Sequence, residues 1–122
     1  MQTVATALVV LIGVVHCYFL VLEMFLWTTP FGLKTFGRSK EDMEATKVLA
    51  GNQGLYNGFL AAGLFWGAFS AGETGGELRL FFLGCVLVAG VYGGATAARK
   101  ILYVQALPAL VAIVCVLLAG RA

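Results

Sequence analysis

The feature that constrains this chain most is its first apolar stretch, from Thr3 to Trp27, in which Glu23 is the only charged residue. A stretch of this length and polarity can cross the hydrocarbon core of a bilayer as a helix, which takes about 20 residues. No basic residue precedes it and no small-residue cleavage site follows it, as they would in a secretory signal peptide. We therefore expect a permanent membrane span.

The composition of the whole chain agrees with a membrane protein. Of its 122 residues, 61% are hydrophobic and only 11% are charged, which is far from the balance of soluble domains. The net charge of +2 is small and spread along the chain, so nucleic acid is not an expected partner. The three cysteines lie in apolar runs and no CxxC or HExxH motif is present, so we expect no metal site.

Hydropathy and helix breakers predict an all-α chain, a four-helix transmembrane bundle that forms a single integral membrane domain over residues 1–122. The predicted spans cover about 3–27, 47–71, 78–98 and 101–119, with a long loop at about 28–46. Ser39, with Asp42 three residues later, predicts the N-cap of a helix that begins near Lys40. Pro108 predicts a kink in the fourth span.

The basic residues predict an orientation in the membrane. Six lie on the side of the first and third loops and two, Arg79 and Arg121, lie on the other side; the six are Lys34, Arg38, Lys40, Lys47, Arg99 and Lys100. Cytoplasmic loops carry the excess of Lys and Arg, so both termini are expected outside a bacterial inner membrane.

Small residues recur at steps of four in the second and third predicted spans. Examples are Gly54 and Gly58, and Gly90 and Gly94. Such steps let helices approach closely in lipid, either within one chain or between copies. A four-span bundle of this size has little interior, so we expect a homo-oligomer, and a trimer in particular.

Polar side chains gather in the cytoplasmic half of the predicted bundle. At a rise of about 1.5 Å per residue, His16 and Asn57 fall at the midplane and Glu23 lies about 12 Å nearer the cytoplasmic face. Polar groups are costly in hydrocarbon unless they meet partners, so we expect them to converge on a cavity open to the cytoplasm. The other candidates at this level are Asn52, Gln53, Tyr56, Tyr92 and Arg99.

These residues suggest a set of chemical roles. We assign acid–base chemistry to Glu23 and His16 and proton donation to Tyr92. We assign substrate binding to the remaining candidates, which are Asn52, Gln53, Tyr56, Asn57 and Arg99.

Each role has a structural alternative. Glu23 can form an ion pair with Arg99 or Lys47, or a hydrogen bond to Asn52 or Gln53. His16 can be a core histidine whose hydrogen bonds are satisfied, and the carboxamides can serve only to hold helices together.

Two blocks, HCYFLVLEMFLWTTPFGLKTFG and EATKVLAGNQGLYNGFLAAGLFWG, resemble the bacterial membrane protein family called domain of unknown function 1304. That resemblance covers essentially the whole chain and implies four transmembrane helices. The overall plan is also similar to the superfamily of membrane-associated proteins in eicosanoid and glutathione metabolism, which implies a trimer with a site for glutathione and a lipophilic substrate. The pair Asn57 and Gly58 resembles small haem-containing membrane epoxide isomerases, which implies haem ligation by His16.

The sequence therefore predicts a membrane-embedded isomerase or transferase that acts on a small lipophilic substrate. The alternatives are a proton-coupled transporter that uses Glu23 and a structural or assembly subunit without chemistry.

Overall fold

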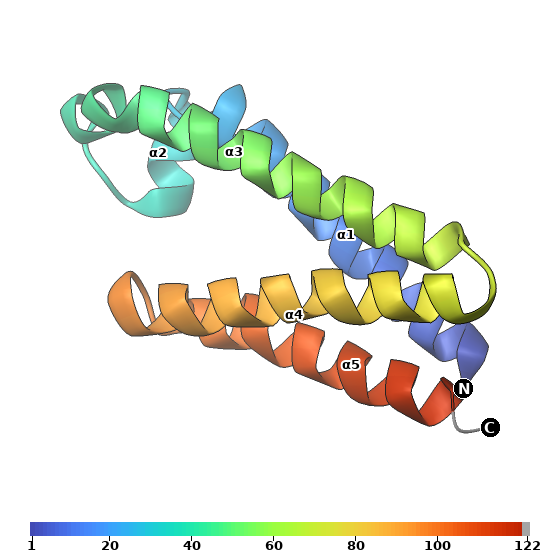
Figure 1. Cartoon of the computed structure of the whole chain (residues 1–122). Coiled ribbons are helices and arrows are strands. Elements are labelled where there is room, and N and C mark those ends of the chain that lie inside the picture. Colours follow the sequence, from blue (N-terminus) through green and yellow to red (C-terminus); the bar gives the residue numbers. More distant parts are fainter. Residues whose placement is uncertain (121–122) are drawn as a thin grey trace. The chain divides into compact units, whose positions relative to one another are not determined.

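The computed structural model describes residues 1–120, and within that range every regular element is a helix. The helices are α1 (Gln2–Met24), α2 (Pro30–Phe36), α3 (Lys40–Phe69), α4 (Gly72–Thr96), the π-helical turn η1 (Leu102–Ala106) and α5 (Leu107–Gly120) (Figure 1). The predicted all-α class is confirmed.

Three helices, not four, are long and apolar enough to cross a membrane within the described part of the chain. They are α1, α4 and the continuous helix formed by η1 and α5. The prediction of a fourth span over residues 47–71 is wrong by this measure, although α3 covers that segment. The reason is its composition, because Asn52, Gln53 and Asn57 lower the hydropathy of a stretch that is otherwise rich in Ala, Leu and Phe.

The chain divides into two compact units. Unit 1 consists of Met1–Gly13 and the described part of Ala62–Ala122, and so includes α4, η1 and α5. Unit 2 is Val14–Ala61, which holds the second half of α1, all of α2 and most of α3.

The core of unit 1 is a close seam between α4 and the helix that follows it. Leu83 and Val86 of α4 and Ala109 and Ala112 of α5 are fully buried. A Cβ at Gly90 would lie 2.7 Å from the backbone nitrogen of Ala106, so only glycine permits this approach. The small residues predicted to mark helix contacts are therefore used within one chain at this seam.

The π-helical turn η1 ends two residues before Pro108, where the sequence predicts a kink. Proline has no backbone N–H, so the α-helical ladder loses one hydrogen bond around it. The ladder shifts register instead, and the N–H of Leu107 donates to the carbonyl oxygen of Leu102, five residues earlier.

Unit 2 turns the chain from α1 to α3 through a short capped helix. The predicted loop at 28–46 contains α2, whose N-cap Thr29 accepts a hydrogen bond from the backbone N–H of Gly32 at 3.3 Å, with Pro30 at the first helical position. Gly37 ends α2 in the left-handed conformation, with φ 62°. The predicted cap of α3 is confirmed, because Ser39 Oγ accepts from the Asp42 N–H at 3.2 Å.

The second half of α1 packs against α3 through glycines. A Cβ at Gly54 would lie 2.7 Å from Cγ of Met24, and one at Gly58 would lie 2.6 Å from Cδ1 of Leu20. At the end of this contact Trp27 Nε1 donates to Thr46 Oγ1 at 3.1 Å. These contacts fix the register of α3 against the last turns of α1.

Candidate functional site

A short hydrogen bond in unit 2 joins α1 and α3 through a buried acid. Asn57 Nδ2 on α3 donates a hydrogen bond to Glu23 Oε1 on α1 at 2.5 Å. Only 8% of Glu23 is exposed, and no cation of the described residues lies within ion-pair distance of it. The carboxyl thus has a neutral hydrogen-bond partner and no cationic partner among the described residues.

The glycines of α3 place this carboxyl against its partner. A Cβ added at Gly54 would lie 3.1 Å from the Cβ of Glu23, and Gly58 lies beside Leu20. Because neither glycine has a side chain, the two backbones come close enough for the short Asn57 side chain to reach the carboxyl. The pair sits in the last turn of α1, which ends at Met24.

His16 lies on the same helix as Glu23 and is almost fully buried, with 1% of its surface exposed. Its ring meets the ring of Phe19 edge-on, with the centroids 5.3 Å apart. Seven residues separate it from Glu23, which places both on one face of α1 at about 10.5 Å along the axis. A group bound at one of them therefore touches the other only if it extends over two helical turns.

The remaining predicted residues of α3 do not join the Glu23 contact. Asn52, Gln53 and Tyr56 are exposed on the surface of the chain, where the ring of Tyr56 meets Phe59 edge-on. The carboxamide patch of the sequence is therefore divided. Asn57 faces α1, and the other three polar side chains face outward.

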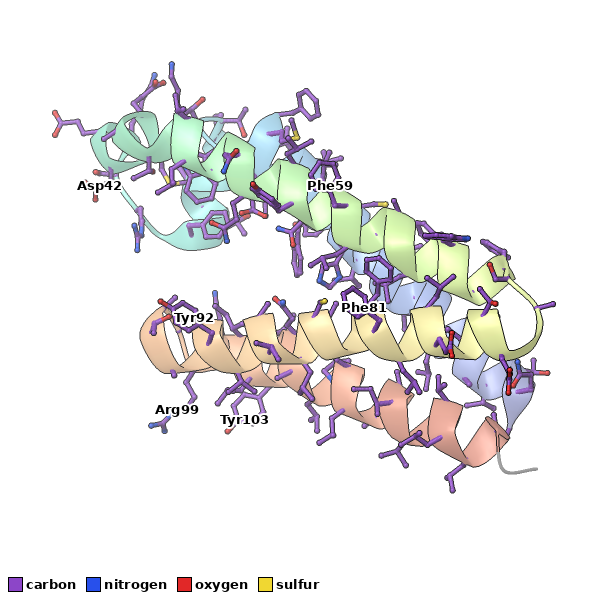
Figure 2. The ribbon with its side chains drawn as sticks, viewed as in Figure 1. Asp42, Phe59, Phe81, Tyr92, Arg99 and Tyr103 are labelled. Atoms are coloured by element: carbon purple, nitrogen blue, oxygen red, sulfur yellow. The ribbon has the colours of Figure 1, made fainter. Side chains whose placement is uncertain are left out.

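Tyr92 and Arg99 belong to unit 1, at and beyond the end of α4. Tyr92 is 71% exposed and Arg99 is also exposed, and in Figure 2 the Arg99 side chain projects away from the ribbon together with Tyr103. Arg99 and Glu23 belong to different units, so their predicted structural pairing stays a prediction. Lys47 pairs instead with Glu44 of its own helix at 3.2 Å.

A second buried charge was not among the residues predicted from the sequence. Arg79 is 5% exposed, and its Nε and Nη2 donate to the carbonyl oxygens of Gly67 and Ala68 at 2.8 and 2.9 Å. By its position in the sequence it counts only as a basic residue that flanks the third span. The one signal of its burial is that it lies about two turns inside a helix that begins at Gly72.

The described residues contain no cluster of three or more His, Cys, Asp or Glu side chains that could hold a metal ion. The side chains that unit 2 offers for chemistry are the Glu23 carboxyl, the Asn57 carboxamide and the His16 imidazole. A carboxyl with a hydrogen-bond donor fixed at one oxygen can exchange a proton at the other oxygen or bind a basic group there.

Comparisons with known proteins place the chain in a family. The family described as "Protein of unknown function (DUF1304)" matches residues 10–117. The uncharacterised protein YpaA of Lactococcus lactis subsp. lactis (strain IL1403) is 30% identical over 116 residues, which cover 93% of this chain and 97% of that protein. No solved structure matches the chain.

The first resemblance drawn from the sequence is confirmed by these matches. The resemblance to the membrane-associated proteins in eicosanoid and glutathione metabolism is not shown by them and stays a prediction. Since the family match extends over nearly the whole chain, the protein belongs to the DUF1304 family of proteins of unknown function.

Proposed function

We propose that this protein is a membrane-embedded enzyme that isomerises a small lipophilic substrate, with Glu23 as the group that moves the proton. The observation that carries the proposal is the buried Glu23 carboxyl on the span candidate α1, held by Asn57 at 2.5 Å. An ionisable residue inside a membrane span is costly and is kept mainly where it serves a function.

Isomerisation suits this site better than group transfer. One carboxyl can take a proton from one carbon of a substrate and return it to another, so a single base is sufficient. A group transfer needs a second bound reactant. Asn57 holds one carboxyl oxygen and leaves the other for the substrate.

A second candidate is a proton-coupled transporter, and the neutral environment of Glu23 favours it. No described cation pairs with this carboxyl. A carboxyl without a protein counter-ion can exchange its proton for a cationic substrate, which is the central step of proton-coupled exchange. Both functions therefore use Glu23. The enzyme would convert its substrate into an isomer, and the transporter would carry its substrate across the membrane unchanged.

The proposed functional form is a homo-oligomer, a trimer, in the bacterial inner membrane. Support comes from the outward face of α3, where Asn52, Gln53 and Tyr56 are exposed. Carboxamides that face lipid without partners cost several kcal/mol by transfer to hydrocarbon, and a second copy packed on this face would offer partners. This arrangement has both termini outside and the α2 region and the Arg99 turn in the cytoplasm. It requires α3 to cross the bilayer as well, although the hydropathy of α3 is below that of the three span candidates.

The test of the site uses protein purified in mild detergent, without added substrate. Mass spectrometry of the organic extract should find a small lipophilic molecule that is retained by the wild type and by Glu41→Gln, a change in an exposed acid of α3, and is lost in Glu23→Gln. Retention by all three proteins, or by none of them, would contradict a site at Glu23.

Activity then separates the two functions. Incubation of the retained molecule with fresh protein should yield an isomer of equal mass only when Glu23 is intact. Uptake of that molecule into proteoliposomes, driven by a proton gradient and without change of the molecule, would favour the transporter.

Native mass spectrometry tests the oligomer by measuring the number of copies in the double variant Asn52→Leu/Gln53→Leu. The control is Asn52→Gln, which keeps a carboxamide. Loss of the oligomer in the leucine variant alone supports polar contacts between copies, and an unchanged oligomer contradicts them.

A further inference from the structure

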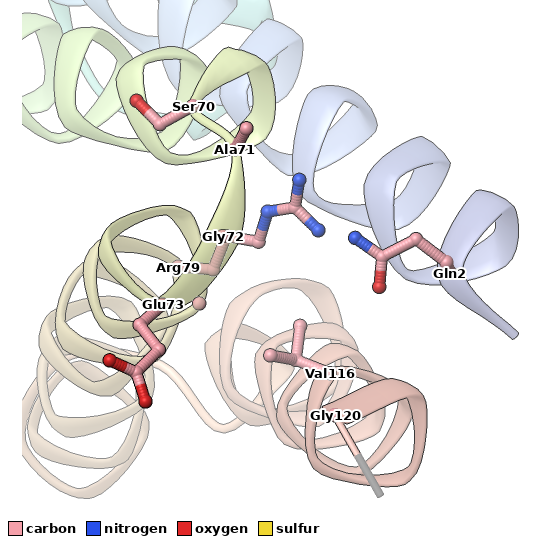
Figure 3. Close-up of a pocket in the computed structure, with 9 residues that line it drawn as sticks. Gln2, Ser70, Ala71, Gly72, Glu73, Arg79, Val116 and Gly120 are labelled. Atoms are coloured by element: carbon pink, nitrogen blue, oxygen red, sulfur yellow. The ribbon is translucent and has the colours of Figure 1, made fainter. Parts of the chain in front are cut away.

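The end of unit 1 holds a cavity built around the second buried charge of the chain. The cavity measures about 310 Å³ and lies where the beginning of α1, the turn between α3 and α4, and the end of α5 meet (Figure 3). Its lining includes Gln2, Ser70, Gly72, Arg79 and Val116. All of these belong to unit 1, so the cavity is complete within one compact unit.

Arg79 supplies a positive charge that the described residues do not balance. Its Nε and Nη2 cap the carbonyl end of α3 at Gly67 and Ala68, while Nη1 makes no hydrogen bond to a described residue. No carboxylate of residues 1–120 lies within ion-pair distance of the guanidinium. Backbone carbonyls satisfy donors but do not neutralise a full charge, so a buried guanidinium in this state favours an anion.

The start of α4 adds further donors to the same cavity. Ala71 is its N-cap and makes no side-chain capping bond, so the first backbone N–H groups of α4 keep their hydrogen-bonding capacity. The positive end of the helix dipole lies there too. Glu73 also lines the cavity, but in Figure 3 its carboxylate points away from the guanidinium of Arg79 and from Gln2.

From this geometry we propose that the cavity binds a phosphate group, with Arg79 Nη1 and the first N–H groups of α4 as donors and the Gln2 amide at the rim. The three span candidates begin or end at this cavity, which puts it at the level of lipid headgroups when they cross a bilayer. The phosphate can therefore belong to an anionic lipid or be free in solution. This site lies in unit 1 and does not depend on the function proposed for Glu23.

The test uses Gly76, which lines the cavity and whose added Cβ would meet nothing within 4 Å. Gly76→Glu brings a negative charge to the cavity while leaving both capping bonds of Arg79 in place, and Gly76→Gln is the neutral control of equal size. Arg79→Gln is measured beside them, but it also removes a helix cap and can fail to fold.

Two arms identify the source of the phosphate. In the first, thermal unfolding in neutral detergent is followed in sodium phosphate and in sodium chloride of equal ionic strength. In the second, native mass spectrometry counts lipids retained on protein released from nanodiscs of phosphatidylcholine with or without phosphatidylglycerol. We expect the wild type and Gly76→Gln to respond in at least one arm, and Gly76→Glu to bind roughly tenfold to hundredfold more weakly, as expected for losing a charge-assisted hydrogen bond.

A response to phosphate alone assigns the site to a free anion, and retention of phosphatidylglycerol assigns it to a lipid. Equal behaviour of Gly76→Glu and Gly76→Gln in both arms, with both variants folded, would overturn the proposal and leave Arg79 as a helix cap only.

Discussion

The contact between Glu23 and Asn57 gives the most demanding prediction about this fold. Asn57→Leu removes the donor and leaves the carboxyl of Glu23, a residue that is 8% exposed, without its hydrogen-bond partner. Hydrogen bonds to charged groups contribute about 1.5–3 kcal/mol in proteins, but interhelical bonds measured in membranes average about 0.6 kcal/mol with a maximum of about 1.7. We expect a loss near the upper membrane value, about 1.5 kcal/mol, because the distance is short and no described cation shares the carboxyl.

The double variant decides between a specific bond and general packing. Replacing both partners by apolar groups of similar size leaves no polar group unsatisfied and can be nearly neutral. Glu23→Leu/Asn57→Leu should therefore be more stable than Asn57→Leu alone, with a coupling of about 1 kcal/mol or more between the two changes. Unfolding of wild type, both single variants and the double variant in detergent, with added dodecyl sulfate as denaturant, measures this cycle. Single losses that add to within about 0.5 kcal/mol would refute the reasoning, since independent sites behave that way.

Three further predictions concern the scaffold of unit 2 and use the same unfolding assay. Gly54→Val should lower the free energy of unfolding by about 1–3 kcal/mol, because a Cβ there would lie 2.7 Å from a side-chain carbon of α1. Gly51→Ala, whose added Cβ meets nothing within 4 Å, should stabilise α3 by up to about 1 kcal/mol. Equal effects of the two changes would contradict the contact between α1 and α3. Thr46→Val removes the acceptor of the Trp27 indole and should cost about 1 kcal/mol, and an unchanged stability and fluorescence spectrum of that indole would argue against the bond. Gly37→Ala forces a side chain into the left-handed region at φ 62° and should cost about 1–2 kcal/mol; a neutral result would show that α2 ends differently.

Much of the local structure follows from the sequence because short-range chemistry decides it. Ser39 and Asp42 form the predicted helix cap, and α3 begins at Lys40 as expected. The helix that contains Pro108 has a π-helical turn before the proline, and the kink predicted there stays a prediction. Each of these outcomes depends on residues within a few positions of each other.

The hydrogen-bond partner of Glu23 could not be predicted, because the centres of the predicted spans give only the depth of each residue in the bilayer. On that basis the acid meets Asn52 or Gln53, and Asn57 lies deeper. The structure ends α1 at Met24 and sets the register of α3 by its glycines, which brings Asn57 to the carboxyl. Side-chain contacts between helices, rather than hydropathy, decide which polar groups meet.

The same limit explains the number of span candidates and the unpredicted burial of an arginine. Apolar composition favours a membrane for α1, α4 and α5, but a helix that carries three carboxamides falls below the hydropathy of a span even when its second half is apolar. In the sequence, Arg79 follows a glycine-rich turn and therefore counts as a loop charge. Its burial depends on the carbonyl end of α3 folding back over it, which no local pattern encodes.

Chemical labelling of carboxyls in intact membranes tests the central claim most directly. A hydrophobic carbodiimide reaches acids from the lipid phase, and a water-soluble carbodiimide reaches acids that face solvent. We predict that the hydrophobic reagent labels Glu23, that the water-soluble one labels the exposed acids Glu41 and Glu44, and that a lipophilic ligand retained by the protein protects Glu23. Labelling of Glu23 by the water-soluble reagent as readily as Glu41, or by neither reagent, would contradict a buried carboxyl open to a substrate from the bilayer.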